Sequence, residues 1–143
     1  MKVAIIGAGK LGTKDATALL GGDHSITVID VNEEKLNKIS QQMDVLTVVG
    51  NGLSIKLLES CGINKFDFLI ATTGSDEHNI IIASFAKKLG CSKVIARVRD
   101  PEHMKQIDFI KEEMNIDHVV NTDLAITLEI YKYLENKKNG WLV

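Results

Sequence analysis

The chain has 143 residues and a mass of 15.7 kDa, which is the size of one domain with a single core. Apolar residues make up 45% and charged residues 25% of the sequence, which argues against a disordered or fibrous chain. Its net charge of −2, with basic and acidic residues intermixed, indicates no nucleic-acid surface. Since no apolar run approaches the ~20 residues that span a membrane, we expect a cytoplasmic protein without direct membrane insertion.

Short apolar segments alternate with helical patterns along the whole chain. We expect strands at 2–6, 25–29, 45–49, 68–71, 93–98 and 117–121. Helices are expected at 11–20, 33–42, 53–60 and 76–89, then from residue 100 or 101, and finally from 122 or 123 to about 138. Continuous runs such as VAII and FLIA are typical of parallel strands buried on both faces. The sequence therefore predicts an α/β fold, a Rossmann-like doubly wound sheet of six parallel strands with its ligand at their carboxyl ends.

A glycine-rich turn, GAGKLG, lies between the first expected strand and helix. In such a turn Gly7 makes the tight bend, Gly9 lets a pyrophosphate approach the backbone, and Gly12 lets the helix pack on the sheet. Free N–H groups at the helix start favour an anion, although glycine-rich turns also arise for steric reasons alone. The candidate phosphate-binding residues are Gly7, Ala8, Gly9, Lys10, Leu11 and Gly12.

An acidic residue, Asp30, ends the second expected strand. A carboxylate there accepts hydrogen bonds from both ribose hydroxyls of an adenosine, and the alternative is an ordinary acid at a helix start. Together with the glycine turn, Asp30 favours an adenine nucleotide or dinucleotide. Because an acid repels a 2′-phosphate, NAD is favoured over NADP.

Polar residues also follow the third and fourth expected strands. Asn51 and Gly52 belong to a Gly-Asn-Gly turn that suits close approach to a base, or is simply a strand-to-helix turn. Thr72, Thr73 and Gly74 offer hydroxyls and a helix N-terminus beside the ligand, a role compatible with helix capping.

The only two arginines of the chain, Arg97 and Arg99, stand at the end of the fifth expected strand. Residues two apart in a strand point to the same side, and a rigid bidentate donor suggests recognition of phosphate or carboxylate. The alternative is a surface ion pair with Asp100 or Glu102.

The sequence contains no motif of an acid–base or nucleophilic site. Its four histidines are scattered, its two cysteines form no CxxC or Cys/His cluster, and the nucleotide fold uses up the chain that a dehydrogenase needs for a substrate domain. We therefore expect neither enzymatic activity nor a metal. The cofactor-binding domain of a small NAD-dependent oxidoreductase is the alternative.

The expected fourth helix carries apolar residues on more than one stripe, between Ile80 and Leu89. This pattern predicts self-association through the fourth, fifth and last helices. Burial of both sides within one chain is the alternative.

The motifs GAGKLG, IDVNEEKL, VVGNGLS, IATTGSDEHN, KVIARVRDPEH and VVNTDLA follow one another as in a known family. Over about residues 2–134 the chain resembles the regulatory N-terminal domain of TrkA/KtrA-type potassium-uptake proteins, also called the RCK or KTN domain. The resemblance implies a nucleotide sensor that binds NAD(H), or ATP, ADP or AMP in the same site. It also implies a membrane-embedded potassium transporter or channel as partner, a position at the cytoplasmic membrane through that partner, and a homodimer or larger ring.

The same resemblance implies a role for each part of the site. By it, residues 2–135 form the nucleotide-binding domain, and 136–143 begin a linker to a further C-terminal part. Asn51 departs from the Asp of many relatives, and we expect Arg97 to sense which nucleotide is bound. The roles implied are phosphate for Gly7, Gly9 and Gly12, ribose for Asp30, adenine for Asn51 and Gly52, the floor for Thr72 and Thr73, and phosphate or nicotinamide for Arg97. Val31 and Gly74 are further expected cofactor-binding residues.

Overall fold

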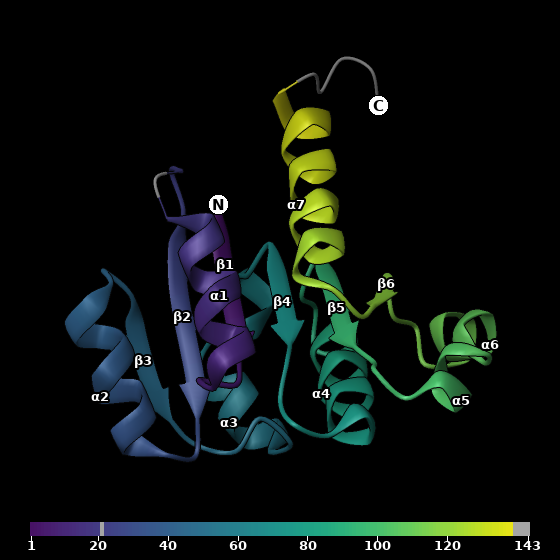
Figure 1. Cartoon of the computed structure of the whole chain (residues 1–143), viewed down its shortest axis with the longest axis horizontal. Coiled ribbons are helices and arrows are strands. Elements are labelled where there is room, and N and C mark those ends of the chain that lie inside the picture. The colour runs from purple at the N-terminus through teal and green to yellow at the C-terminus, as the bar shows by residue number, and fades with distance from the viewer. Residues whose placement is uncertain (21, 139–143) are drawn as a thin grey trace.

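Six parallel strands form one sheet in the computed structural model, which describes residues 1–20 and 22–138 (Figure 1). Their order is β3-β2-β1-β4-β5-β6, so the winding reverses between β1 and β4. This confirms the predicted Rossmann-like doubly wound sheet. The strands are β1 (Lys2–Ile6), β2 (Ser25–Asp30), β3 (Leu46–Val49), β4 (Phe68–Ala71), β5 (Lys93–Arg97) and β6 (His118–Val120).

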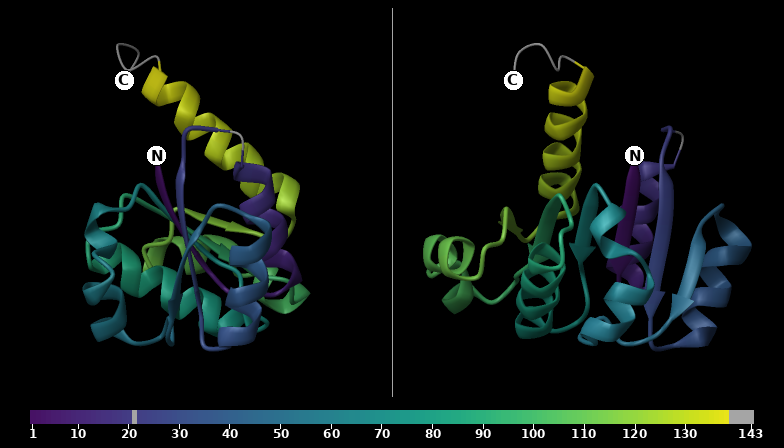
Figure 2. Two further views of the ribbon diagram at one scale, coloured as in Figure 1. Left: turned by 90° about the vertical axis from the view of Figure 1, so that its left-hand side faces the viewer. Right: turned by 180° about the vertical axis from the view of Figure 1, so that it is seen from behind.

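Helices cover both faces of the sheet, as the two further views show (Figure 2). One face packs on α1 (Lys10–Leu19), α2 (Glu33–Gln42) and α7 (Asp123–Lys138). The other packs on α3 (Ile55–Ser60), the short 3₁₀ helix η1 (Ile63–Lys65), α4 (Asp76–Lys88) and α6 (Ile107–Glu113), with α5 (Pro101–Met104) beside it. Successive residues of β1 serve the two cores in turn, since Val3 and Ile5 face α1 whereas Ala4 and Ile6 face α4.

The C-terminal half of the chain differs from expectation in one place. The expected fifth helix is two short helices, α5 and α6, because the backbone at Gln106 leaves the helical range (φ −106°, ψ 16°). The last helix runs to Lys138, as expected, and projects past the sheet (Figure 1). The remainder of the expected linker, 139–143, lies outside the described residues. No helix in the described ranges has the length and apolar character needed to cross a membrane.

The apolar helix α4 is largely covered within the chain. Ile82, Ala83 and Ala86 are buried, while Ile80 and Phe85 are half-buried against the same core. The surplus apolar surface is on α7 instead, where three side chains are about half exposed or more: Leu124 (68%), Leu128 (49%) and Tyr131 (58%). Self-association through these helices stays a prediction.

The start of α1 approaches the β1–α1 turn more closely than any side chain allows. A Cβ added at Gly12 would lie 1.8 Å from the carbonyl oxygen of Gly7. Gly7 has a φ of +121°, and a Cβ there would lie 2.7 Å from the carbonyl oxygen of Thr72. Gly9, in contrast, has nothing within 4 Å of an added Cβ. The fold therefore requires glycine at positions 7 and 12, whereas it does not require glycine at position 9.

A buried arginine ties four parts of the fold together. The guanidinium of Arg97 is 2% exposed and donates from Nε to Thr72 Oγ1 (2.9 Å) and from Nη1 to the Asn121 carbonyl (2.6 Å). Its Nη2 lies 3.1 Å from Asp15 Oδ2 and 2.6 Å from Asp123 Oδ1. Arg97 thereby joins the end of β5 to the end of β4, to α1 and to the start of α7.

The two arginines do not share one side of the sheet. Arg99 follows the end of β5, so strand alternation does not apply to it, and its Nη2 donates to the Gly74 carbonyl before α4. The alternative, an ion pair with Asp100 or Glu102, does not hold for Arg97 either, because Arg97 pairs with Asp15 and Asp123.

The pKa of the Asp15 carboxyl in this cluster is set by opposing effects. Burial raises its pKa to about 7, the Arg97 guanidinium opposes the rise, and the neighbouring Asp123 adds to it. The folded protein therefore binds a proton at Asp15 over a pH range in which the unfolded chain has released it. The stability that this group contributes is therefore fully present below about pH 4, and it is lost as the pH rises through about 7.

We expect Gly12→Ala to lower the free energy of unfolding by at least about 2 kcal/mol, although alanine is the better helix former. The added methyl group must displace a backbone oxygen 1.8 Å away. Gly9→Ala is the matched control, because its methyl meets nothing within 4 Å and its φ is −76°. Urea denaturation measures both variants, and equal losses in the two would contradict this steric account.

We expect Asp15→Asn to remove part of the pH dependence of stability. Between pH 5 and 7 the wild type should lose stability through Asp15, by at most about 1.4 kcal/mol per pH unit, and the variant should not. Urea denaturation at pH 5, 6, 7 and 8 measures the slope. Asp44→Asn, a substitution of an exposed acid, is the control. Identical slopes for wild type and Asp15→Asn would show that Asp15 stays ionised throughout.

Candidate functional site

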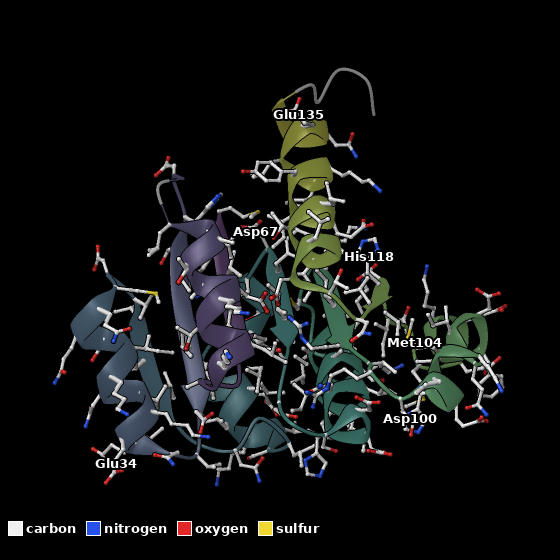
Figure 3. The ribbon with its side chains drawn as sticks, viewed as in Figure 1. Glu34, Asp67, Asp100, Met104, His118 and Glu135 are labelled. Carbon is white, nitrogen blue, oxygen red and sulfur yellow. The ribbon has the colours of Figure 1, made fainter. Side chains whose placement is uncertain are left out.

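A cavity of about 410 Å³ opens at the carboxyl ends of β1 to β4, where the winding of the sheet reverses. Glu34 and Asp100 mark the two ends of this edge of the molecule, opposite the far end of α7 at Glu135 (Figure 3). Most of the expected site residues meet here. The lining consists of Ile6, Gly7, Gly9, Ile29, Asp30, Val31, Lys35, Gly50, Asn51, Gly52, Leu53, Thr72, Thr73, Gly74, His78 and Ile82.

The α1 end of the cavity offers free backbone donors. Gly9 is the N-cap of α1, and the N–H groups of Lys10 and Leu11 have no acceptor among the described residues. Lys10 and Ala8 line a smaller hollow of about 250 Å³ next door, which shares Gly9 and Lys35 with the main cavity. A helix N-terminus flanked by two lysines favours an anionic group.

Asp30 supports the glycine turn in addition to facing the cavity. Its Oδ2 accepts from the Ala8 N–H (2.7 Å) and its Oδ1 from the Asn32 N–H (2.7 Å). The helix cap of α2 is Asn32, whose side chain accepts from the Lys35 N–H, so Asp30 does not cap that helix. Each carboxylate oxygen keeps a lone pair, which is what two adjacent hydroxyl groups need.

The β3 end of the cavity combines apolar surface with one amide. Val31 is 68% exposed, which leaves an aliphatic surface uncovered beside the cavity. A Cβ added at Gly52 would lie 2.5 Å from Ile6 Cγ2, so the loop runs tight against β1. The Asn51 Oδ1 accepts from the Leu53 N–H (2.9 Å).

The β4 end is held by a buried asparagine that the sequence analysis did not single out. Asn79 is 0% exposed, and its Oδ1 accepts from the N–H and the hydroxyl of Thr73. Its Nδ2 donates to the carbonyl oxygens of Thr73 and Arg97. Asn79 thus fixes the loop 72–74, and only its place in the motif IATTGSDEHN could have indicated it.

Next to this loop, Asp76 at the start of α4 binds the segment that follows β5, because its carboxylate accepts from the N–H groups of Arg99 and Asp100. Burial opposes its charge, but the N–H groups of Asp100 and Arg99, together with His103, outweigh that effect and lower its pKa. The hydrogen bond with Asp76 raises the pKa of His103. This contact holds the β5 loop and is not part of the cavity lining.

Five expected residues do not line this cavity, and two of them, Ala8 and Lys10, line the smaller hollow next to it. Leu11 and Gly12 lie within α1, where Gly12 serves the packing described above. Arg97 is enclosed by Thr72, Asp15, Asp123 and the Asn121 carbonyl, so the prediction that it meets a phosphate or a nicotinamide needs correction. It supports the cavity wall from behind, through Thr72. The main additions to the predicted set are Lys35 and His78, which lie within the quoted motifs IDVNEEKL and IATTGSDEHN but were not singled out.

A larger cavity, of about 750 Å³, lies between the end of α1 and α7. Its walls are mainly apolar, from residues such as Leu19, Ile130 and Leu134, and no helix of the described ranges begins in its lining. The smaller cavity at the strand ends carries the convergent polar groups and is the functional candidate. Among the described residues, no group of three His, Cys, Asp or Glu side chains could hold a metal ion.

Residues 3–122 match the family model of the TrkA-N domain. A Trk system potassium uptake protein TrkA homolog from Methanothermobacter thermautotrophicus is 32% identical over all of this chain and 64% of its own length. The Trk system potassium uptake protein TrkA of Haemophilus influenzae is 32% identical over 94% of this chain and 30% of its own length. The chain therefore spans from about a third to about two thirds of these relatives.

Solved structures share the fold. The TrkA-N domain of the inner membrane protein ybaL from Escherichia coli superposes with a TM-score of 0.72 at 19% identity, over 93% of this chain and 96% of that one. The GsuK channel bound to NAD gives a TM-score of 0.71 at 18% identity, over 83% of this chain and 21% of that one. The match of the family model over most of the sequence shows that the chain belongs to the TrkA-N domain family.

Proposed function

We propose that this chain is a nucleotide-binding regulatory domain of a potassium-transport system. It binds NAD(H), or ATP, ADP or AMP in the same site, and transmits the bound state to a membrane-embedded potassium transporter or channel. The observation that carries the proposal is the cavity at the strand ends, with an anion-binding helix start beside a carboxylate that has free lone pairs. The relatives named as TrkA proteins, and the NAD-bound GsuK channel of like fold, support it.

The strand order supports one direction for the ligand. The β1 end, with the start of α1, suits phosphates, and the β2 end, with Asp30, suits the adjacent ribose. The base then falls at the β3 end, between Val31 and the loop 50–53. The second half of a dinucleotide extends toward Thr73, Gly74 and His78 at the β4 end.

Each residue has a definite task in this arrangement. The free N–H groups of Lys10 and Leu11 donate to phosphate oxygens, and Lys35 adds positive charge at the same end. Asp30 accepts from the ribose hydroxyls while it holds the glycine turn through Ala8. A 2′-phosphate would meet that carboxylate, so NAD is favoured over NADP.

We propose a sensor rather than an enzyme, which fits relatives named as TrkA proteins. Hydride transfer needs a substrate pocket with an acid or base beside the nicotinamide. Among the described residues that line the β4 end, His78 is the one that could serve, and it is an exposed residue at the start of α4. The alternative remains an oxidoreductase cofactor domain, which should discriminate against mononucleotides.

The partner and the assembly are further parts of the proposal. We propose that the domain works at the cytoplasmic side of the membrane through its transporter, as a homodimer or larger ring. Residues 2–135 would form the nucleotide domain, and the chain from 136 would lead toward a further C-terminal part. The exposed apolar side chains of α7 are available for such contacts.

We expect Asp30→Ala to weaken NAD binding about tenfold or more, because a partly buried acceptor of ribose hydroxyls contributes on the order of 1–3 kcal/mol. Isothermal calorimetry with NAD and AMP measures the loss. Glu34→Gln, a substitution of an exposed acid outside the lining, is the control. Thermal melting shows whether loss of the Ala8 contact also loosens the fold. Unchanged affinity in a folded Asp30→Ala would remove Asp30 from the site.

We expect no consumption of NADH above the buffer rate when the protein is incubated with a panel of carbonyl acceptors. Absorbance at the reduced nicotinamide band measures this. Turnover that disappears in His78→Ala would support the oxidoreductase alternative instead.

A further inference from the structure

The second arginine of the chain, Arg99, carries a charge that no carboxylate in the described ranges pairs with. Its side chain is exposed, and its Nη2 donates to the Gly74 carbonyl oxygen (3.1 Å). That bond is the one side-chain hydrogen bond of Arg99 among the described residues, whereas Arg97 is held by two carboxylates. A guanidinium has five N–H donors in a rigid fork, so most of the donors of Arg99 remain available.

The acidic residues around Arg99 hold its backbone and not its guanidinium. Asp76 accepts from the backbone N–H groups of Arg99 (3.0 Å) and Asp100 (2.8 Å), and it also contacts His103 Nδ1 (3.1 Å). The Asp100 carboxylate accepts from the Glu102 N–H at the start of α5. The segment that carries Arg99 is thus fixed against α4, while its charged group is left for another partner.

The contact with Gly74 places this guanidinium beside the β4 end of the strand-end cavity. Gly74 lines the cavity together with Thr72, Thr73 and His78, and this part of the lining contains neither lysine nor arginine. Thr73 already donates both its N–H and its hydroxyl to the buried Asn79. Arg99 therefore adds to this wall the charge-assisted, bidentate donors that its lining residues lack.

The strand order indicates which part of a nucleotide reaches the β4 wall. With the ribose at Asp30 on β2 and the first phosphate at the α1 start beside β1, further phosphates run away from the ribose and toward β4. The glycine turn touches the β4 loop, since a Cβ added at Gly7 would lie 2.7 Å from the Thr72 carbonyl oxygen. The lysines at the α1 start, Lys10 and Lys35, line the hollow beside α2 instead, on the ribose side.

We propose that Arg99 binds the terminal phosphate of ATP in this site and thereby makes the site favour ATP over AMP. The proposal rests on the nucleotide-binding function proposed above and names the residue that distinguishes the phosphate chains. The planar guanidinium fork matches two oxygens of one phosphate, which a lysine ammonium cannot do. Arg97, enclosed by its own ion pairs, is not available for this task.

Calorimetry with AMP and ATP, without divalent cations, tests the proposal on the wild type and on Arg99→Gln. The variant should lose about tenfold or more in affinity for ATP, because it loses charge-assisted hydrogen bonds to the terminal phosphate. Its affinity for AMP should change by less than about threefold, since a single phosphate stays at the α1 start. Lys105→Gln, which removes an exposed cation outside the cavity lining, is the matched control and should keep the wild-type ratio of the two affinities.

The outcomes separate this inference from the function on which it rests. Equal proportional losses for AMP and ATP in Arg99→Gln would show that Arg99 only supports the Gly74 loop, and would overturn the inference. A preference for ATP that disappears in Lys10→Gln but persists in Arg99→Gln would overturn it too, by assigning the terminal phosphate to the hollow beside α2. A wild type that binds NAD or AMP but does not favour ATP leaves the proposed function standing without the inference. If AMP, ATP and NAD all fail to bind, the proposed function itself fails.

A measurement on the wild type keeps the test independent of how the variants fold. The chain has two arginines, so its arginine Nε–H groups give two NMR signals that the variants assign. Titration with ATP should shift the Arg99 signal and leave the Arg97 signal in place, and AMP should move neither. An Arg99 signal that stays unmoved at saturating ATP would overturn the inference.

Discussion

The contact on which the site depends is the close approach of α1 to the end of β1. With no side chain at Gly12, the first turn of the helix rests on the Gly7 carbonyl, and its free N–H groups point to the edge of the sheet. Asp30 fixes the same turn from the neighbouring strand by accepting from the Ala8 N–H. The helix start and the ribose acceptor, the two features proposed to bind a nucleotide, are thus held in place without a ligand. Such preorganisation favours affinity, because less order must be imposed on binding.

The cluster around Arg97 relates this site to the rest of the chain. Thr72 lines the cavity, and its hydroxyl accepts a hydrogen bond from the Arg97 Nε. Asp123 and the Asn121 carbonyl bind the other nitrogens of the guanidinium at the start of α7. The cavity wall and the last helix are therefore bound to one buried cation. Removing that cation would leave Asp15 buried without its counter-charge, so we expect loss of Arg97 to destabilise the contact between α1, the strand ends and α7.

The sequence was sufficient for the sheet and for most of the cavity, because both rest on local signals. Apolar runs predict the strands, the spacing of Gly7, Gly9 and Gly12 predicts the turn, and Asp30 follows from its place at a strand end. The role of Arg97 was not predictable in this way, since Asp15 lies 82 positions from it in the sequence and Asp123 lies 26. Asn79 was missed for a similar reason: a polar residue in a helix shows its function only when the loop it fixes is seen.

We propose that the strand-end cavity, and not the larger apolar cavity beside α7, holds a nucleotide. The most direct test is a titration of ¹⁵N-labelled protein with NAD, followed by amide NMR. We expect saturable shifts at Gly9, Lys10 and Gly52, with the Arg97 side-chain Nε–H unmoved in its cluster and Ile130 and Leu134 unaffected. Shifts confined to the α1–α7 cavity, or no shift at millimolar NAD, would contradict the account.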